Sequence, residues 1–434
     1  MLTREENELL CRIGPQAPMG RMIRRYWVPA LMSDELEADG DPKRVRLLGE
    51  TFVAFRDSKG RVGMLDELCP HRGAALVLGR NEDCGLRCLY HGWKFDVTGR
   101  IVDTPAEPET SQLKTNVRAR AYALREAGGI IWAYLGPPEL EPPPLAFEFT
   151  KLPASHCVVV KARIACNWVQ CLEGVIDSAH SNLLHADTFK PAAGMAVSDY
   201  KGSSLQVERP SNDARPRLDV EETPYGFRYA AIRKPMVDPD KNAYIRVTHF
   251  VAPFYGMFPG QKGWGTMQAF VPIDDHSTFL YFVRYTYDKP IDAAERQRQI
   301  AWSGFRVGID IDKNFTMFRN RENNWLQDRE MMKRGESFSG VSGVQVEDAM
   351  VQESMGPLYD RSQEHLGIGD LAIVRMRRMM LASVRRFSES GEAPLGLSQP
   401  VDYARLRAAE LMLPLGASWQ KALGDAGPAE KTPA

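Results

Sequence analysis

Two short cysteine–histidine pairs carry the clearest chemical signal in this sequence. Cys69 and His71 form a C-x-H pair, and Cys88 and His91 form a C-x2-H pair after a gap of sixteen residues. Two thiolates on one iron and two imidazoles on the other raise the reduction potential of a [2Fe-2S] cluster above that of an all-cysteine cluster. We therefore predict a cluster that passes single electrons.

A structural zinc ion is the alternative, because two cysteines and two histidines also suit tetrahedral zinc. The flanking residues favour the cluster. Each pair enters a glycine turn, C-P-H-R-G from Cys69 and C-L-Y-H-G-W from Cys88, and C-x-H is shorter than the usual zinc knuckle. This context resembles the Rieske [2Fe-2S] domain, in which the exposed edges of His71 and His91 are where electrons enter and leave.

A second group of possible ligands lies between Asn167 and His185. Two imidazoles and one carboxylate leave open positions on an iron, as in the non-heme Fe(II) oxygenases. We predict His180 and His185 as these imidazoles. The pair alone is weak evidence, and its occurrence beside the cluster motif strengthens it. A helix over 167–184 would place Gln170, Glu173, Asp177 and His180 on one face, with a local irregularity needed for His185 to reach the same metal.

With both motifs present, the chain resembles the Rieske non-heme iron aromatic-ring oxygenases, and among them the phthalate dioxygenase-like oxygenase subunits, from Met1 to about Phe387. The resemblance implies that His180 and His185 hold a mononuclear iron and that Asp177 is a bridging residue. It also implies a third ligand far downstream. The matching position is Asp348, with Glu347 as its close competitor and Asp360 and Asp370 as weaker ones.

Asp177 has a physical role as well. A carboxylate three residues before an iron ligand can hydrogen bond to the outer imidazole nitrogen and fix the tautomer. The resemblance further implies that Asp177 contacts His91 of the partner subunit, so that electrons cross a subunit boundary and activity requires a homotrimer or a multiple of trimers. Asn167, Gln170 and Glu173 either support this site or are ordinary helix residues.

The substrate-binding residues are predicted mainly from the resemblance. Arg217 and Arg246, in strand-like segments, stand where phthalate dioxygenase-like proteins place carboxylate-binding arginines, and Ser181 is a weaker candidate. A guanidinium binds a carboxylate bidentately, which would orient an aromatic acid over the iron. The alternative is that both arginines are exposed strand residues.

The expected function is that of a terminal oxygenase, which uses dioxygen to hydroxylate a phthalate-like aromatic acid. Electrons would come from a separate flavin and iron–sulfur reductase that oxidises NADH or NADPH, because we find no Gly-rich dinucleotide fingerprint in this chain. O-demethylation of a methoxylated aromatic acid is the alternative within the class. A Rieske electron-transfer protein without oxygenase activity is the alternative outside it. The identity of the substrate, the reductase and the product type stay open.

Composition agrees with a cytoplasmic enzyme. The net charge is −1, from 55 basic and 56 acidic side chains, which argues against nucleic acid or an anionic membrane as a partner. No apolar run is long enough for a membrane span, and residues 1–7 are too charged for a signal peptide. Seven cysteines show no disulfide framework.

The patterns predict an α+β protein with a small β domain that carries the cluster, followed by a larger domain of strands and helices. The resemblance implies that these are an all-β Rieske domain and a helix-grip catalytic domain, in which an antiparallel sheet surrounds a helix. We expect an N-terminal helical segment over 1–26, the Rieske domain over 27–138, the catalytic mononuclear-iron domain over 139–424 and a tail over 425–434. Helices are predicted over 3–11, 371–387 and 403–423, and strands over 45–48, 51–55, 130–134, 157–160, 227–232, 244–251, 266–271 and 278–287.

Overall fold

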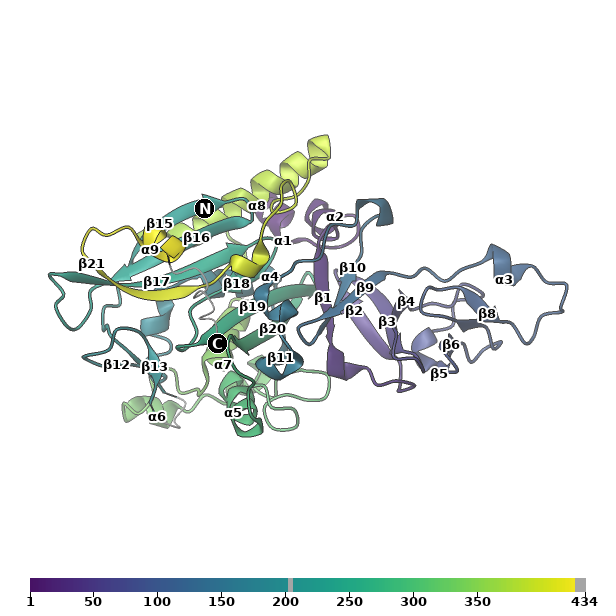
Figure 1. The fold of residues 1–434 in the computed structure, drawn as a ribbon, viewed down its shortest axis with the longest axis horizontal. Helices are drawn as coiled ribbons and strands as arrows, with labels where there is room; N and C mark the ends of the chain where they lie inside the picture. Colours follow the sequence, from purple (N-terminus) through teal and green to yellow (C-terminus); the bar gives the residue numbers. More distant parts are fainter. Residues whose placement is uncertain (202–205, 426–434) are drawn as a thin grey trace, which may run out of the picture. The chain divides into compact units, whose positions relative to one another are not determined.

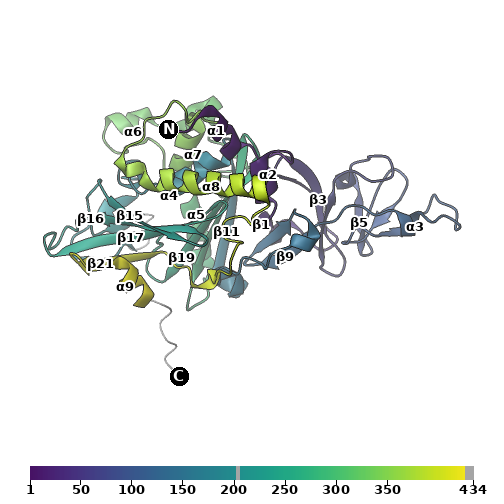
Figure 2. The ribbon, with the colours of Figure 1, turned by 90° about the horizontal axis from the view of Figure 1, so that it is seen from above.

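The structure, a computed structural model, describes residues 1–201 and 206–425 and is drawn from two sides in Figures 1 and 2. Two compact units make up the chain. The small unit contains Ile13–Leu145 and Pro272–Asp274, and the large unit contains Met1–Arg12, Ala146–Val271 and the chain from Asp275 on. The first helix thus belongs to the large unit and the second to the small one. The tail expected over 425–434 lies outside the described residues, apart from Asp425.

The small unit is built from three antiparallel sheets with two short helices. Its middle strands are the most apolar. In β10, all five residues are buried because this strand lies between β1 and β9. The sheets are β1 (Trp27–Met32), β10 (Ile130–Tyr134) and β9 (Ala123–Ala127); β2 (Lys43–Leu47), β3 (Glu50–Arg56) and β4 (Val62–Asp66); and β5 (Arg80–Glu82), β6 (Gly85–Arg87), β7 (Lys94–Phe95) and β8 (Ile101–Asp103), with the helices α2 (Pro18–Ile23) and α3 (Leu113–Asn116).

The large unit is organised around one antiparallel sheet in the order β11-β20-β19-β18-β17-β16-β15, with β21 paired to β17. Its strands are β11 (Cys157–Ile164), β15 (Arg217–Thr223), β16 (Gly226–Arg233), β17 (Asn242–Val251), β18 (Tyr255–Met257), β19 (Trp264–Asp274), β20 (Ser277–Thr286) and β21 (Ala409–Pro414). A small separate sheet contains β12 (Phe189–Pro191), β14 (Val207–Arg209) and β13 (Asp199–Tyr200).

Helices pack against this sheet. The apolar helix α4 (Trp168–Ile176) contacts β17, β18 and β20, while α8 (Leu371–Ser390) lies along β15 and β16 (Figure 2). The predicted N-terminal helix is confirmed as α1 (Arg4–Cys11), which begins with a capping box between Thr3 and Glu6. The other helices are α5 (Ala293–Ser303), α6 (Arg329–Lys333), α7 (Val344–Ser354) and α9 (Trp419–Asp425).

Together the two units confirm the α+β class, while two helix predictions are wrong. The helix expected over 167–184 ends at Ile176, because the Asp177 carboxylate accepts a hydrogen bond from the Ala179 N–H at 2.7 Å and turns the chain. The helix expected over 403–423 is instead the strand β21 followed by α9. Pairing with β17 decides this strand, and a local pattern cannot show such a distant partner. No helix in the described ranges is long and apolar enough to cross a membrane.

Candidate active site

The two cysteine–histidine loops of the small unit have the same backbone hydrogen bonds. The Gly73 N–H donates to the Cys69 carbonyl at 2.8 Å, and the Gly92 N–H donates to the Cys88 carbonyl at 3.0 Å. Both glycines have positive φ, 74° and 75°, which other residues rarely adopt. The repeated turn therefore explains the glycine that follows each pair in the sequence.

These loops present their ligands side by side. Cys69 and Cys88 are each 3% exposed within the apolar core of the unit. The rings of His71 and His91 lie 4.4 Å apart, centroid to centroid, and both stay partly exposed. The ring of Trp93 stacks on His71 at 4.6 Å. The arrangement buries the sulfurs and leaves the imidazole edges at the surface.

Two features fit a metal cluster at this position. His91 Nδ1 is buried without a hydrogen-bond partner, and burial raises the pKa of Cys69 to about 11, which a bound metal cation would offset. The four residues do not converge on one point. Within the described ranges, only His180, His185 and Asp348 bring three ligand atoms within 4.8 Å of one another.

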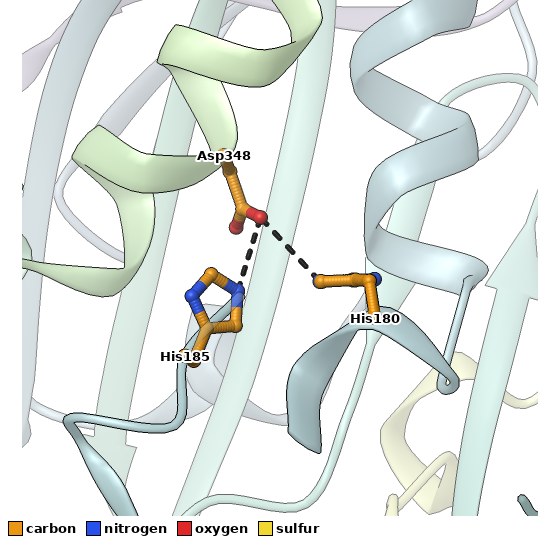
Figure 3. A group of neighbouring side chains, drawn as sticks. All are labelled: His180, His185 and Asp348. Carbon is orange, nitrogen blue, oxygen red and sulfur yellow. Dashed lines mark ion pairs between the residues drawn. The ribbon is translucent and has the colours of Figure 1, made fainter. Parts of the chain in front are cut away.

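The second group lies in the large unit, where three segments meet (Figure 3). His180 begins the 3-10 turn η6 (His180–Asn182), His185 follows it, and Asp348 lies on α7. Asp348 Oδ1 is 3.4 Å from His180 Nε2 and 3.1 Å from His185 Nε2. The break after α4 is therefore the irregularity that brings both imidazoles to one carboxylate.

Each imidazole has a second carboxylate on its outer nitrogen. Asp177 Oδ2 lies 3.3 Å from His180 Nδ1, and Glu347 Oε2 lies 2.8 Å from His185 Nδ1. Glu347 also accepts a hydrogen bond from the Ser339 hydroxyl at 2.6 Å. Such contacts fix the tautomer that leaves Nε2 free for a metal. Sequence reasoning treated Glu347 only as a competing ligand. In the structure, its carboxylate contacts the outer nitrogen of His185.

The electrostatics suit a divalent cation between these groups. Burial opposes a charge on His180, but Asp177 and Asp348 outweigh it and raise the pKa of His180 to about 10. Burial also opposes ionisation of Asp348, yet His185 and His180 hold the pKa of this carboxyl well below its usual range. In addition, His185 Nε2 is buried, and the neighbour that it has among these side chains is Asp348 Oδ1 at 3.1 Å. A bound metal would take the place of the protons between the three side chains.

A cavity of about 110 Å³ opens beside this group. One wall is the sheet, where alternate residues of neighbouring strands share a face. Aromatic rings supply much of the remaining surface, which suits a flat apolar ligand with a few polar groups. The sheet residues that line the cavity are Tyr229, Arg246, Thr248, Thr266, Gln268, Phe282 and Arg284, and further rings come from Phe189, Tyr200, Phe258 and Trp302.

Of the three residues that were expected to bind substrate, two line the cavity and one does not. Arg217 is exposed on β15 and does not line the cavity. Arg246 does line it, but its guanidinium pairs with Glu410 and donates to the Pro259 carbonyl at 3.2 Å. Ser181 also lines the cavity, and its hydroxyl donates to the Ser178 carbonyl at 3.1 Å.

Sequence reasoning missed Arg209, at the end of β14. Its side chain lines the cavity, is 5% exposed, and stacks on Phe189 with 3.5 Å between the guanidinium carbon and the ring centroid. Nη1 is 3.3 Å from Ser181 Oγ and from Asn182 Oδ1, Nε has no partner, and no acid within the described ranges pairs with it. Burial lowers the pKa of Arg209, as does the nearby Arg246. The strand has only three residues, too few to show a pattern.

Three residues that were expected either to support this site or to be ordinary helix residues make contacts within the fold. Asn167 caps α4 and donates to the Cys11 carbonyl at 3.1 Å. Gln170 donates to the Gln352 carbonyl at 3.0 Å. Glu173 pairs with two buried arginines, Arg361 at 2.9 Å and Arg377 at 2.6 Å. None of the three lines the cavity.

Asp360 and Asp370, the weaker candidates for the third ligand, do not join the group. The Asp360 carboxylate accepts from the Ser362 hydroxyl at 2.7 Å, and the Asp370 carboxylate accepts from the Gly367 N–H at 2.6 Å. Both contacts are local turns of the chain.

Comparisons with known proteins cover nearly the whole chain. Residues 26–117 match the Rieske [2Fe-2S] domain, and residues 133–431 match the family described as LigXa C-terminal domain like. The phthalate 4,5-dioxygenase oxygenase subunit of Pseudomonas putida is 44% identical over 97% of this chain and 94% of its own length. The 5,5'-dehydrodivanillate O-demethylase oxygenase subunit of Sphingobium sp. (strain NBRC 103272 / SYK-6) is 31% identical over 91% of this chain and 83% of its own. Among solved structures, dicamba monooxygenase bound to 3,6-dichlorosalicylic acid shares the fold, with a TM-score of 0.57 and 16% identity over 85% of this chain and 99% of that one.

Proposed function

This chain belongs to the Rieske non-heme iron oxygenases as an oxygenase subunit, and on that premise we propose that it hydroxylates a phthalate-like aromatic carboxylic acid. Its cofactors are a [2Fe-2S] cluster and a mononuclear iron. When bound, the cluster relays single electrons and the iron activates dioxygen. The side chains hold these groups, exclude water and orient the acid.

We assign the cluster to Cys69, His71, Cys88 and His91. The iron is assigned to His180, His185 and Asp348, because their ligand atoms lie within 4.8 Å of one another and Asp348 Oδ1 is close to both Nε2 atoms. The outer carboxylates of Asp177 and Glu347 hold the two imidazoles in the required orientation.

We infer the substrate class from the guanidinium of Arg209, which has no acidic partner within the described ranges. A buried cation without a counter-ion is costly, and a substrate carboxylate would supply one beside the iron ligands. Phe189 and Tyr229 would then face the ring of the acid. Arg246 is already neutralised by Glu410, so it shapes the wall, and the Ser181 hydroxyl lies within reach of the same carboxylate.

Oxygenase subunits of this kind work in multicomponent systems. For this chain we propose a flavin and iron–sulfur reductase that uses NAD(P)H, and a homotrimer in which the partner subunit's His91 approaches Asp177. The Asp177 side chain is 24% exposed, so it is accessible to such a contact. None of the seven cysteines, all of which lie in the described ranges, forms a disulfide, which supports a reducing compartment such as the cytoplasm.

O-demethylation of a methoxylated aromatic acid is the second candidate. It is favoured by the relative that is an O-demethylase subunit and matches 91% of this chain. The same residues would serve, because the product depends on which carbon the cavity places near the iron.

The test is product analysis under ¹⁸O-labelled dioxygen with the reduced holoenzyme and a panel of phthalates, benzoates and methoxybenzoates. We expect labelled hydroxyl groups on the ring of at least one phthalate or benzoate. Release of formaldehyde from methoxybenzoates alone would establish the second candidate. Absence of oxygen uptake with every acid would refute both.

A further inference from the structure

Trp93, which follows the glycine of the second cluster loop, carries a buried donor that lacks an acceptor. Its side chain is 2% exposed and lies in the same apolar core as Cys69 and Cys88. The indole Nε1 is buried and has no hydrogen-bond partner among residues 1–201 and 206–425. An indole N–H can only donate, and leaving such a donor buried and unsatisfied is unfavourable. The small unit therefore has an unsatisfied donor in the core that contains both cysteines.

The two cluster loops differ at the position of Trp93. In the first loop, the Cys69 N–H donates to the Ala74 carbonyl at 2.8 Å, and in the second loop the Cys88 N–H donates to the Trp93 carbonyl at 2.8 Å. Ala74 and Trp93 thus occupy matching positions, each five residues after its cysteine. An alanine is sufficient to close the first loop. Closing the second loop therefore does not by itself require an indole.

The ring of Trp93 extends from the second loop to a histidine of the first. It lies parallel to the ring of His71, with 4.6 Å between the centroids and 4° between the planes. This stacking holds the indole in one orientation against a proposed cluster ligand. A bound cluster brings sulfide ions and two thiolates to this position, and their negative charge suits an N–H donor.

We propose that the Trp93 N–H donates a hydrogen bond to a sulfur atom of the bound cluster and thereby raises its reduction potential. Reduction adds one negative charge to the cluster, and the hydrogen bond stabilises the reduced form more than the oxidised form. The inference rests on the proposed ligands Cys69, His71, Cys88 and His91, and goes beyond them because it identifies a residue that sets the potential. Trp93 is thus a tuning residue and not a ligand.

The test measures the reduction potential of the cluster in the purified holoenzyme, by redox titration followed through the electron-spin resonance signal of the reduced cluster. Trp93→Phe removes the donor and keeps a ring that can stack on His71. Trp93→3-benzothienylalanine keeps the bicyclic shape and replaces the N–H by sulfur. The matched control is Trp132→Phe, because Trp132 is also a buried tryptophan of the small unit, and its indole N–H donates to the Ala127 carbonyl at 3.1 Å. The Rieske absorbance verifies that each variant holds the cluster.

We expect both changes at Trp93 to lower the equilibrium constant for one-electron reduction by about tenfold, the usual scale for one hydrogen bond to a charged group, which corresponds to about 59 mV. Trp132→Phe should leave the potential unchanged. An unchanged potential in both Trp93 variants would overturn the inference. A lower potential for the phenylalanine variant alone would also overturn it, because packing rather than the N–H would then be responsible.

A second measurement needs no variant. In the unmodified holoenzyme with ¹⁵N-labelled tryptophan, pulsed electron-spin resonance of the reduced cluster should detect coupling to an indole nitrogen and to its exchangeable proton. Absence of this coupling beside a normal Rieske signal refutes this inference alone. If the unmodified protein shows no Rieske signal, the assignment of the cluster under the proposed function fails as well.

Discussion

Glu347 and Asp348 are consecutive residues of α7, yet they lie on opposite sides of one imidazole. Glu347 Oε2 is 2.8 Å from His185 Nδ1, and Asp348 Oδ1 is 3.1 Å from His185 Nε2. The ring is therefore held between two carboxylates that have different tasks. In the proposed site, the first would orient the imidazole from outside, and the second would share the metal with it.

This arrangement predicts different outcomes for two neighbouring substitutions. Asp348→Asn should remove the mononuclear iron and lower the iron content from about three to about two per chain, with the Rieske electron-spin resonance signal intact. Glu347→Gln should keep the ligand and weaken iron affinity by about 10- to 100-fold. Iron analysis after dialysis against graded chelator distinguishes them. Equal iron loss in both variants would contradict the separate roles.

Asp177→Asn tests the proposed contact with the partner subunit's His91. The amide keeps the shape of the side chain, so both metal centres should stay occupied. Turnover should nevertheless fall by about 100-fold or more, because the carboxylate that orients His180 has lost its charge. Iron content and steady-state oxygen uptake are the measurements. Full turnover in a variant with complete iron would exclude the role.

Arg209→Gln should lower kcat/KM for aromatic acids by about 10- to 100-fold, since the substrate carboxylate loses its charged partner. Arg209→Lys should recover only part of this loss, because an ammonium cannot bind a carboxylate bidentately. Arg217→Gln, on the exposed side of β15, is the matched control and should behave like the unmodified enzyme. Equal effects of Arg209→Gln and Arg217→Gln would contradict the assignment.

A buried histidine outside the cavity gives a pH-dependent prediction. His249 accepts a hydrogen bond from the Tyr225 hydroxyl at 2.8 Å and donates to the Arg407 carbonyl at 3.1 Å, and burial lowers its pKa to about 4. In the unfolded chain, the pKa of His249 is near 6.5, so the unfolded state takes up a proton at a higher pH than the folded state. The contribution of neutral His249 to the free energy of unfolding is therefore complete above pH 6.5 and is lost as the pH falls towards 4.

The lowered pKa of His249 corresponds to about 3 kcal/mol of unfolding free energy between pH 6.5 and 4. Urea unfolding of the unmodified chain and of His249→Gln at several pH values measures it. The variant is expected to be less stable at neutral pH and to show a shallower decline below pH 6.5. Parallel declines in both proteins would show that another group is responsible.

The sequence alone determined the cluster loops. Cysteine, histidine and glycine stand within five residues of one another in each loop, and the turn that positions them is closed by hydrogen bonds inside the same segment. His180 and His185 were predicted as a second group of ligands because their pair occurs together with the cluster motif, and the structure brings both imidazoles to Asp348. Both motifs consist of residues that lie close together in the sequence. They could therefore be predicted, together with the α+β class and the family.

Tertiary structure decided what depended on distant partners. The approach of α7 to η6 places Asp348 beside both Nε2 atoms and Glu347 on the outer side of His185. Arg209 of the small sheet and Arg284 of β20 both line the cavity, whereas Arg217 is exposed on β15. The same holds for β21, which is a strand because β17 offers it an edge. A local sequence pattern indicates which conformation a segment prefers. The burial and the partners of a residue depend instead on segments that are distant in the sequence.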